Sequence, residues 1–116
     1  MDFHLAEAME ILERTPATVS ALLAGLSDSW LYASVGPGTF SPRDVLGHLI
    51  YGEQTDWLPR AKIIVESGET RPFEPWDRTG FGPFIEGRGV GELLMQFADL
   101  RGRNLVELRS LCPDLD

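Results

Sequence analysis

Apolar residues recur every three or four positions in three segments of this chain, which is the spacing of helices that bury one face. The segments cover residues 2–25, 41–68 and 90–112, and no stretch alternates apolar and polar residues as a set of strands would. With 116 residues, the chain has the length of one domain. We therefore predict a single all-α domain over residues 1–116, an antiparallel helix bundle with three long helices.

The start of the second helix is the best-defined boundary. Ser41-Pro42-Arg43-Asp44 places a serine at the N-cap and a proline at the first helical position, and Asp44 can close a capping box. Further along, Pro59 is expected to bend this helix at Trp57-Leu58, because proline removes a backbone donor.

Two other segments carry more irregular signals. In the first helix, Asp2 is a candidate N-cap, and Thr15-Pro16 predicts a kink or a restart with Thr15 as the new cap. Residues 69–89 are rich in glycine, proline and aromatic residues and have no period. We expect the aromatic side chains to pack this segment down as an ordered excursion, since long structureless loops are uncommon in a compact domain.

Charge and composition exclude several classes of partner. Eighteen Asp and Glu against ten Lys and Arg give a formal charge of -8, so neither nucleic acid nor an anionic membrane surface is an expected partner. No apolar run has the length of a membrane span, and the N-terminus lacks the basic region of a signal peptide. The single cysteine, Cys112, fits a reducing compartment. These features predict a cytoplasmic protein.

His48 is the best candidate for chemistry. The phase of the capped helix turns it toward Tyr51, Gly52 and Thr55, near the inner face, and Gly52 leaves room beside the imidazole. From spacing alone, a hydrogen-bonded, half-buried histidine is the more common interpretation, and a metal ligand is the alternative. His4 is expected to be an exposed residue at a helix start, and no HxxxH or HExxH pair occurs.

Other residues give weaker signals. Glu53 and Asp56 could act as a base or a metal ligand, although helical carboxylates are usually solvated. Cys112 has no local motif that would make it a nucleophile. The glycine-rich residues 80–82 and 87–91 lack the strand and the Gly-Lys-Ser/Thr of a phosphate-binding loop. Three arginines of the last helix are expected on an exposed charged face: Arg101, Arg103 and Arg109.

Several of these segments together resemble the DinB-like superfamily, and most closely its YfiT-type metal-dependent hydrolases. The segments are Leu12-Glu13-Arg14-Thr15-Pro16, Phe40-Ser41-Pro42-Arg43-Asp44-Val45-Leu46-Gly47-His48-Leu49-Ile50, Glu53, Asp56-Trp57, Arg60-Ala61, and residues 94–101 and 104–108. The resemblance implies a four-helix bundle with a divalent metal, often zinc or nickel, held by three histidines. His48 matches the first of these ligands. The other two normally form an HxxxH on the fourth helix, so that helix and two ligands are expected to be missing from residues 1–116.

The resemblance leaves two hypotheses for function. The first is a metal-dependent hydrolase or thiol-dependent transferase that acts on a small-molecule or thiol substrate, with His48 as one ligand of an incomplete site. The second is a non-catalytic helical interaction module. In either case, helices that lack a fourth partner keep an exposed apolar seam, and such patches usually become interfaces. We therefore expect a homodimer.

Overall fold

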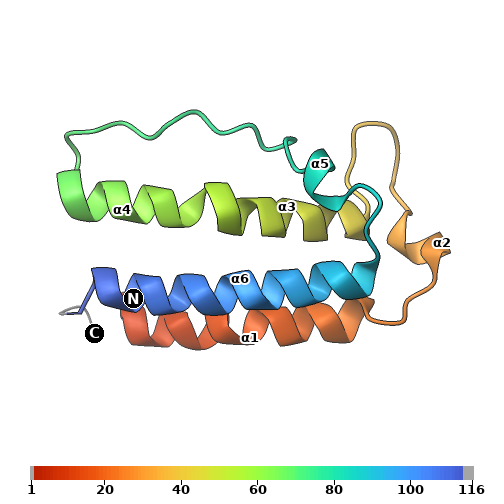
Figure 1. Ribbon diagram of the computed structural model, residues 1–116, viewed down its shortest axis with the longest axis horizontal. Coiled ribbons are helices and arrows are strands. Elements are labelled where there is room, and N and C mark those ends of the chain that lie inside the picture. Colours follow the sequence, from red (N-terminus) through yellow and green to blue (C-terminus); the bar gives the residue numbers. More distant parts are fainter. Residues whose placement is uncertain (1, 114–116) are drawn as a thin grey trace.

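The computed structural model describes residues 2–113, and within this range all regular structure is helical (Figure 1). The six helices are α1 (Leu5–Leu23), α2 (Asp28–Leu31), α3 (Pro42–Thr55), α4 (Trp57–Ser67), α5 (Gly82–Ile85) and α6 (Val90–Leu111). The prediction of an all-α bundle is thus confirmed, and the second of the three predicted long helices is divided into α3 and α4. None of the helices in the described range is long and apolar enough to cross a membrane.

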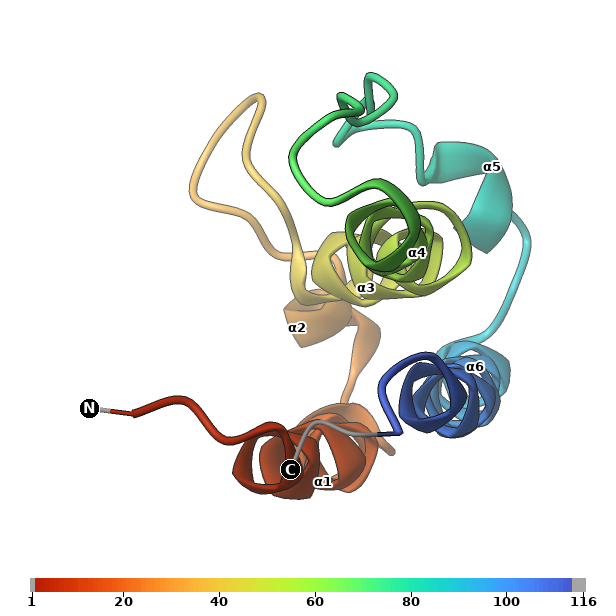
Figure 2. The same ribbon diagram turned by 90° about the vertical axis from the view of Figure 1, so that its left-hand side faces the viewer.

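The long helices form a triangle when the bundle is viewed from its end (Figure 2). Helix α6 packs on both α1 and α3. Helices α3–α4 and α6 run in the same direction, and α1 runs antiparallel to both (Figure 1). The reason is that residues 69–89 return along the whole length of the molecule before α6 begins, as a crossover connection does in a bundle.

The predicted start of α3 is confirmed in detail. Ser41 Oγ accepts a hydrogen bond from the Asp44 backbone N at 3.1 Å, and Asp44 Oδ2 accepts one from the Ser41 backbone N at 2.9 Å. These two bonds form the expected capping box. The predicted bend is also present and lies at Asp56, which has φ -114° and ψ -79° and separates α3 from α4. Pro59 explains the break, because it cannot donate to the carbonyl of Thr55.

The N-cap predicted at Asp2 and the restart predicted at Thr15 are wrong. The helix begins at Leu5 with His4 at the N-cap position, so Asp2 does not cap it. It also continues through Pro16 without a restart, and the Thr15 hydroxyl donates to the carbonyl of Ile11 at 2.9 Å rather than capping a new helix. Pro16 leaves the carbonyl of Leu12 without its helical donor. Arg101 supplies that donor from α6, because its Nη1 lies 2.9 Å from the Leu12 oxygen.

The segment of residues 69–89 is ordered, as its aromatic residues predicted. It contains α5, and its residues Phe81 and Ile85 are buried in the hydrophobic core. Gly47 of α3 allows this close packing, because a Cβ atom there would lie 2.5 Å from Ile85 Cγ2. The buried Arg43 side chain donates to the carbonyl of Ile85 and holds the end of α5 against α3. The side chains with the least exposure in this core belong to Leu46, Ile50, Leu93 and Phe97.

Candidate functional site

His48 is half-buried on α3, beneath the returning segment. Its ring lies 5.6 Å from the ring of Phe40, 5.4 Å from Trp76 and 6.3 Å from Phe81, measured between centroids. These three aromatic residues belong to the segments that flank α3 and not to α1 or α6. His48 is therefore covered by residues 76–81 instead of facing the interface with α6, which differs from the expected interior orientation.

The hydrogen bond of His48 defines its tautomer. Nδ1 lies 3.2 Å from the backbone carbonyl oxygen of Arg78. A carbonyl oxygen can only accept, so Nδ1 of the neutral ring carries the proton and Nε2 carries the lone pair. Within residues 2–113, Nε2 makes no hydrogen bond. The ring is thus oriented through Nδ1, whereas the lone pair on Nε2 is not used in a hydrogen bond within this range.

The segment that covers His48, residues 72–81, is called the aromatic strap below. The Trp76 ring stacks on Tyr51 of α3 with centroids 5.0 Å apart, and Trp76 Nε1 donates to Thr55 Oγ1 at 2.7 Å. Gly80 lies so close to Tyr51 that a Cβ atom there would be 2.6 Å from the Tyr51 hydroxyl oxygen. Side-chain packing, a hydrogen bond and close backbone approach therefore hold the strap on α3.

A local turn gives the strap its shape beside Arg78. The hydroxyl and the backbone N of Thr79 both donate to Asp77 Oδ1, at 2.7 and 2.9 Å. These two hydrogen bonds, the hydroxyl first, lower the pKa of Asp77. The guanidinium of Arg78 lies over the Phe40 ring at 5.3 Å. The Asp77–Thr79 hydrogen bonds and the contact between Arg78 and Phe40 therefore hold the Arg78 carbonyl in position beside His48.

Glu53, the other candidate on α3, belongs to a separate buried cluster. Its carboxylate pairs with Arg101 of α6 and accepts from Trp57 Nε1, and its backbone carbonyl accepts from Asn104 Nδ2 at 2.7 Å. Glu53 is five residues after His48, which places the two side chains about 140° apart around the helix. The structure therefore does not bring Glu53 to His48, and its polar atoms are occupied by helix-to-helix contacts.

The prediction for Arg101 is wrong. Its side chain is 10% exposed and lies between α1, α3 and α6, because it pairs with Glu53 and donates to the Leu12 carbonyl. Arg103 and Arg109 do lie on the surface, where they pair with Asp99 and Glu13. The sequence signal for the buried arginine is its spacing from Phe97 and Leu108, which places it on the apolar face of α6.

The remaining candidate residues, Asp56, His4 and Cys112, do not gather at one site. Asp56 forms an ion pair with Arg60 Nε at 2.8 Å at the α3–α4 break. His4 precedes α1, and Cys112 follows α6 and is half-buried. Those two helix ends lie together at the opposite end of the bundle from the first turns of α3 (Figure 1). The structure therefore does not bring His4 or Cys112 to His48.

The metal that the resemblance implies needs three histidine ligands. In residues 2–113, no three His, Cys, Asp or Glu side chains come together in a group that could hold a metal ion. His48 fits the role of one ligand, since its tautomer leaves a lone pair on Nε2. The described residues do not fit a complete metal centre.

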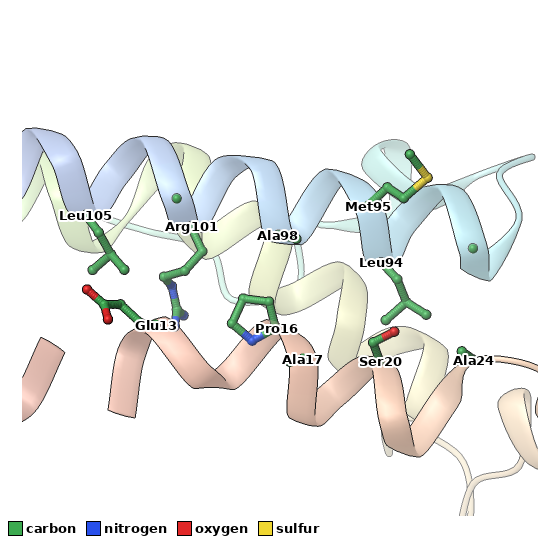
Figure 3. Close-up of a pocket in the computed structure, with 12 residues that line it drawn as sticks. Glu13, Pro16, Ala17, Ser20, Ala24, Leu94, Met95, Ala98, Arg101 and Leu105 are labelled. Carbon is green, nitrogen blue, oxygen red and sulfur yellow. The ribbon is translucent and has the colours of Figure 1, made fainter. Parts of the chain in front are cut away.

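A hollow of about 570 Å³ lies elsewhere, between α1 and α6 (Figure 3). Leu94, Arg101 and Leu105 point from α6 toward α1, and Met95 points away from it. The lining contains many small residues, among them Ala17, Ser20, Ala24, Gly91, Ala98 and Gly102. With few polar groups that converge, the hollow has the character of a contact surface more than that of a catalytic pocket.

The fold and the His48 helix together define a class: an all-helical bundle in which a capped helix carries a histidine under a long crossover segment. The family model of the DinB superfamily matches residues 11–116. The match covers nearly the whole chain, and the protein belongs to the DinB superfamily. No curated protein matches the sequence.

Proposed function

We propose that His48 is one ligand of a divalent metal in a DinB-type site that acts on a small molecule by metal-assisted hydrolysis or thiol transfer. The observation that supports this is the hydrogen bond between Nδ1 and the Arg78 carbonyl. Histidines that bind metals almost always donate their other ring N–H to a carbonyl or a carboxylate, which fixes the tautomer and the ring orientation. His48 has this arrangement without any metal ligand beside it.

The remaining ligands must come from outside residues 2–113 or from another chain, because the described residues supply a single imidazole. Zinc and nickel suit imidazole ligands, and when bound at such a site they promote deprotonation of a water or a thiol. The described residues of this chain contribute by holding the His48 imidazole in one orientation. Trp76 and Phe81 limit the rotation of the imidazole, and the Arg78 carbonyl holds the proton on Nδ1.

Zinc titration by calorimetry tests the proposal. The wild type should bind zinc weakly, because two ligands are missing from the described residues. His48→Ala should abolish this binding, and His4→Ala, which removes the other histidine, should leave it unchanged. Zinc binding that survives His48→Ala, or a wild type that binds no zinc, would contradict the role given to His48.

A second candidate function is a non-catalytic helical module that self-associates. Large apolar side chains on the outside of the bundle favour it, because Ile11 and Leu22 of α1 and Met95 and Val106 of α6 are between 64% and 75% exposed. Exposed apolar surface of this kind is typical of protein interfaces. Sedimentation of the wild type over a range of micromolar concentrations tests it, and a monomer at every concentration would refute it.

A further inference from the structure

We propose that Trp76 is a positioning residue for His48: it fastens the aromatic strap to α3, and the fastened strap selects the His48 tautomer whose lone pair is on Nε2. The inference deepens the proposed function and rests on it, because it concerns the nitrogen that would bind the metal. Trp76 acts on the proton of the imidazole through the backbone carbonyl of Arg78, two residues further along the strap.

Trp76 is the main attachment of its segment to the helices. Every residue from 68 to 79 is exposed except Trp76, which is half-buried. Its ring stacks on Tyr51 with centroids 5.0 Å apart and an angle of 21° between the planes, and its Nε1 donates to Thr55 Oγ1 at 2.7 Å. The packing of one aromatic ring and one hydrogen bond therefore concentrate the attachment at this side chain.

The backbone of the strap is not tied to the helices. In the part of the chain that the structure describes, no backbone-to-backbone hydrogen bond joins residues 72–81 to α3 or α4. Pro72 and Pro75 have no N–H to donate. Phe73 adds a contact at the surface, because the guanidinium of Arg60 lies 5.1 Å from the centroid of its exposed ring. A segment with so few buried contacts opens at a low cost in free energy, so loss of the Trp76 side chain should release it.

The Arg78 carbonyl lies between Trp76 and a second attachment, Phe81, which is buried in the core. These two side chains hold the strap where the carbonyl accepts from His48 Nδ1 at 3.2 Å. The hydrogen bond made by one ring nitrogen of a neutral histidine determines which nitrogen carries the proton. Without this acceptor, a neutral imidazole in water carries its proton mostly on Nε2. Release of the strap would therefore move the lone pair from Nε2 to Nδ1 and block Nε2 as a ligand.

Heteronuclear NMR of the His48 ring nitrogens, recorded on the full chain without metal, tests the role of Trp76. The chemical shift of each nitrogen reports whether it carries the proton, at a pH where His48 is neutral. The wild type should carry the proton on Nδ1, and Trp76→Ala should move most of the population to the tautomer with the proton on Nε2. Trp30→Ala removes a tryptophan that is 64% exposed and lies outside the strap, so it should keep the wild-type tautomer.

Thr55→Val is a second variant, because it removes the acceptor of the Trp76 hydrogen bond and leaves the stacking on Tyr51. It should move the tautomer population in the same direction by a smaller amount. Trp76→Ala should keep the helical circular dichroism of the wild type, since Trp76 lies outside the hydrophobic core, and Thr55→Val decides if it does not. A wild type with its proton on Nε2, or a folded Trp76→Ala that keeps it on Nδ1, would overturn the role of Trp76.

Zinc titration separates this inference from the proposed function. If His48 is a ligand, Trp76→Ala should lower the zinc affinity by about tenfold, as the loss of a group that orients a metal ligand does. An unchanged zinc affinity would overturn the positioning role. A wild type that binds no zinc would refute the metal site, whereas a change of tautomer in Trp76→Ala would still support selection of the tautomer by the strap, because it is measured without metal.

Discussion

Glu53 of α3 and Arg101 of α6 form an ion pair between the helices, with side chains that are 1% and 10% exposed. The same guanidinium donates to the carbonyl of Leu12, which Pro16 of α1 leaves without a helical donor. One arginine thus neutralises the buried Glu53 carboxylate and satisfies the half-buried Leu12 carbonyl on another helix. The arrangement joins all three long helices.

Replacing Arg101 should therefore be strongly destabilising. Arg101→Met leaves the Glu53 carboxylate buried without a cation, and we expect the free energy of unfolding to fall by about 3–5 kcal/mol. The measurement is denaturant unfolding followed by circular dichroism. Arg103→Met, on the exposed side of the same helix, is the matched control and should change stability by less than about 1 kcal/mol. An equal decrease in the free energy of unfolding for both variants would show that the buried ion pair contributes no more to stability than the exposed one.

The capping box at Ser41 predicts a smaller effect. Ser41→Ala removes the acceptor for the Asp44 backbone N and should lower the free energy of unfolding by about 1 kcal/mol. Ser110→Ala, at an exposed position of α6, is the control. An unchanged denaturation midpoint for Ser41→Ala would mean that the cap does not stabilise α3.

Two helix-interior glycines should respond in opposite directions to the same substitution. Gly102→Ala adds a methyl group to open space and should raise the free energy of unfolding by roughly 0.5–1 kcal/mol, because alanine is the better helix former. Gly47→Ala places its Cβ against Ile85 and should lower the free energy of unfolding by about 1–3 kcal/mol. Thermal unfolding at low protein concentration compares the two, and a shift of the same sign for both would contradict the packing at α5.

The aromatic strap should depend on Trp76. Trp76→Ala removes the stacking on Tyr51 and the hydrogen bond to Thr55, so the strap should open more often. We expect trypsin to cleave after Arg78 several times faster than in the wild type. Trp30→Ala, at a position that is 64% exposed, is the control. Unchanged cleavage after Arg78 would show that the strap is held by other contacts.

Local sequence determined the parts of this protein that depend on neighbouring residues. The start of α3 was predictable because Ser41, Pro42 and Asp44 cap the helix by contacts within four positions. Pro59 predicted the break between α3 and α4 for the same reason. The aromatic content of residues 69–89 indicated an ordered segment, because large rings gain free energy when they are packed, as Trp76, Phe81 and Phe84 are.

Tertiary structure decided the rest, because the deciding partners are far away in sequence. Pro16 predicts a kink or a restart when only its neighbours are considered, but Arg101 replaces the lost donor from 89 residues away and the helix continues. Arg101 carries the same charge as Arg103, and only the position of Glu53 makes it the buried one. The orientation of His48 likewise depends on the carbonyl of Arg78, 30 residues further along the chain. The helical period determines on which face of a helix a side chain lies. The segments that pack against that face then determine whether the side chain is buried, which residue it pairs with and, for His48, which tautomer it adopts.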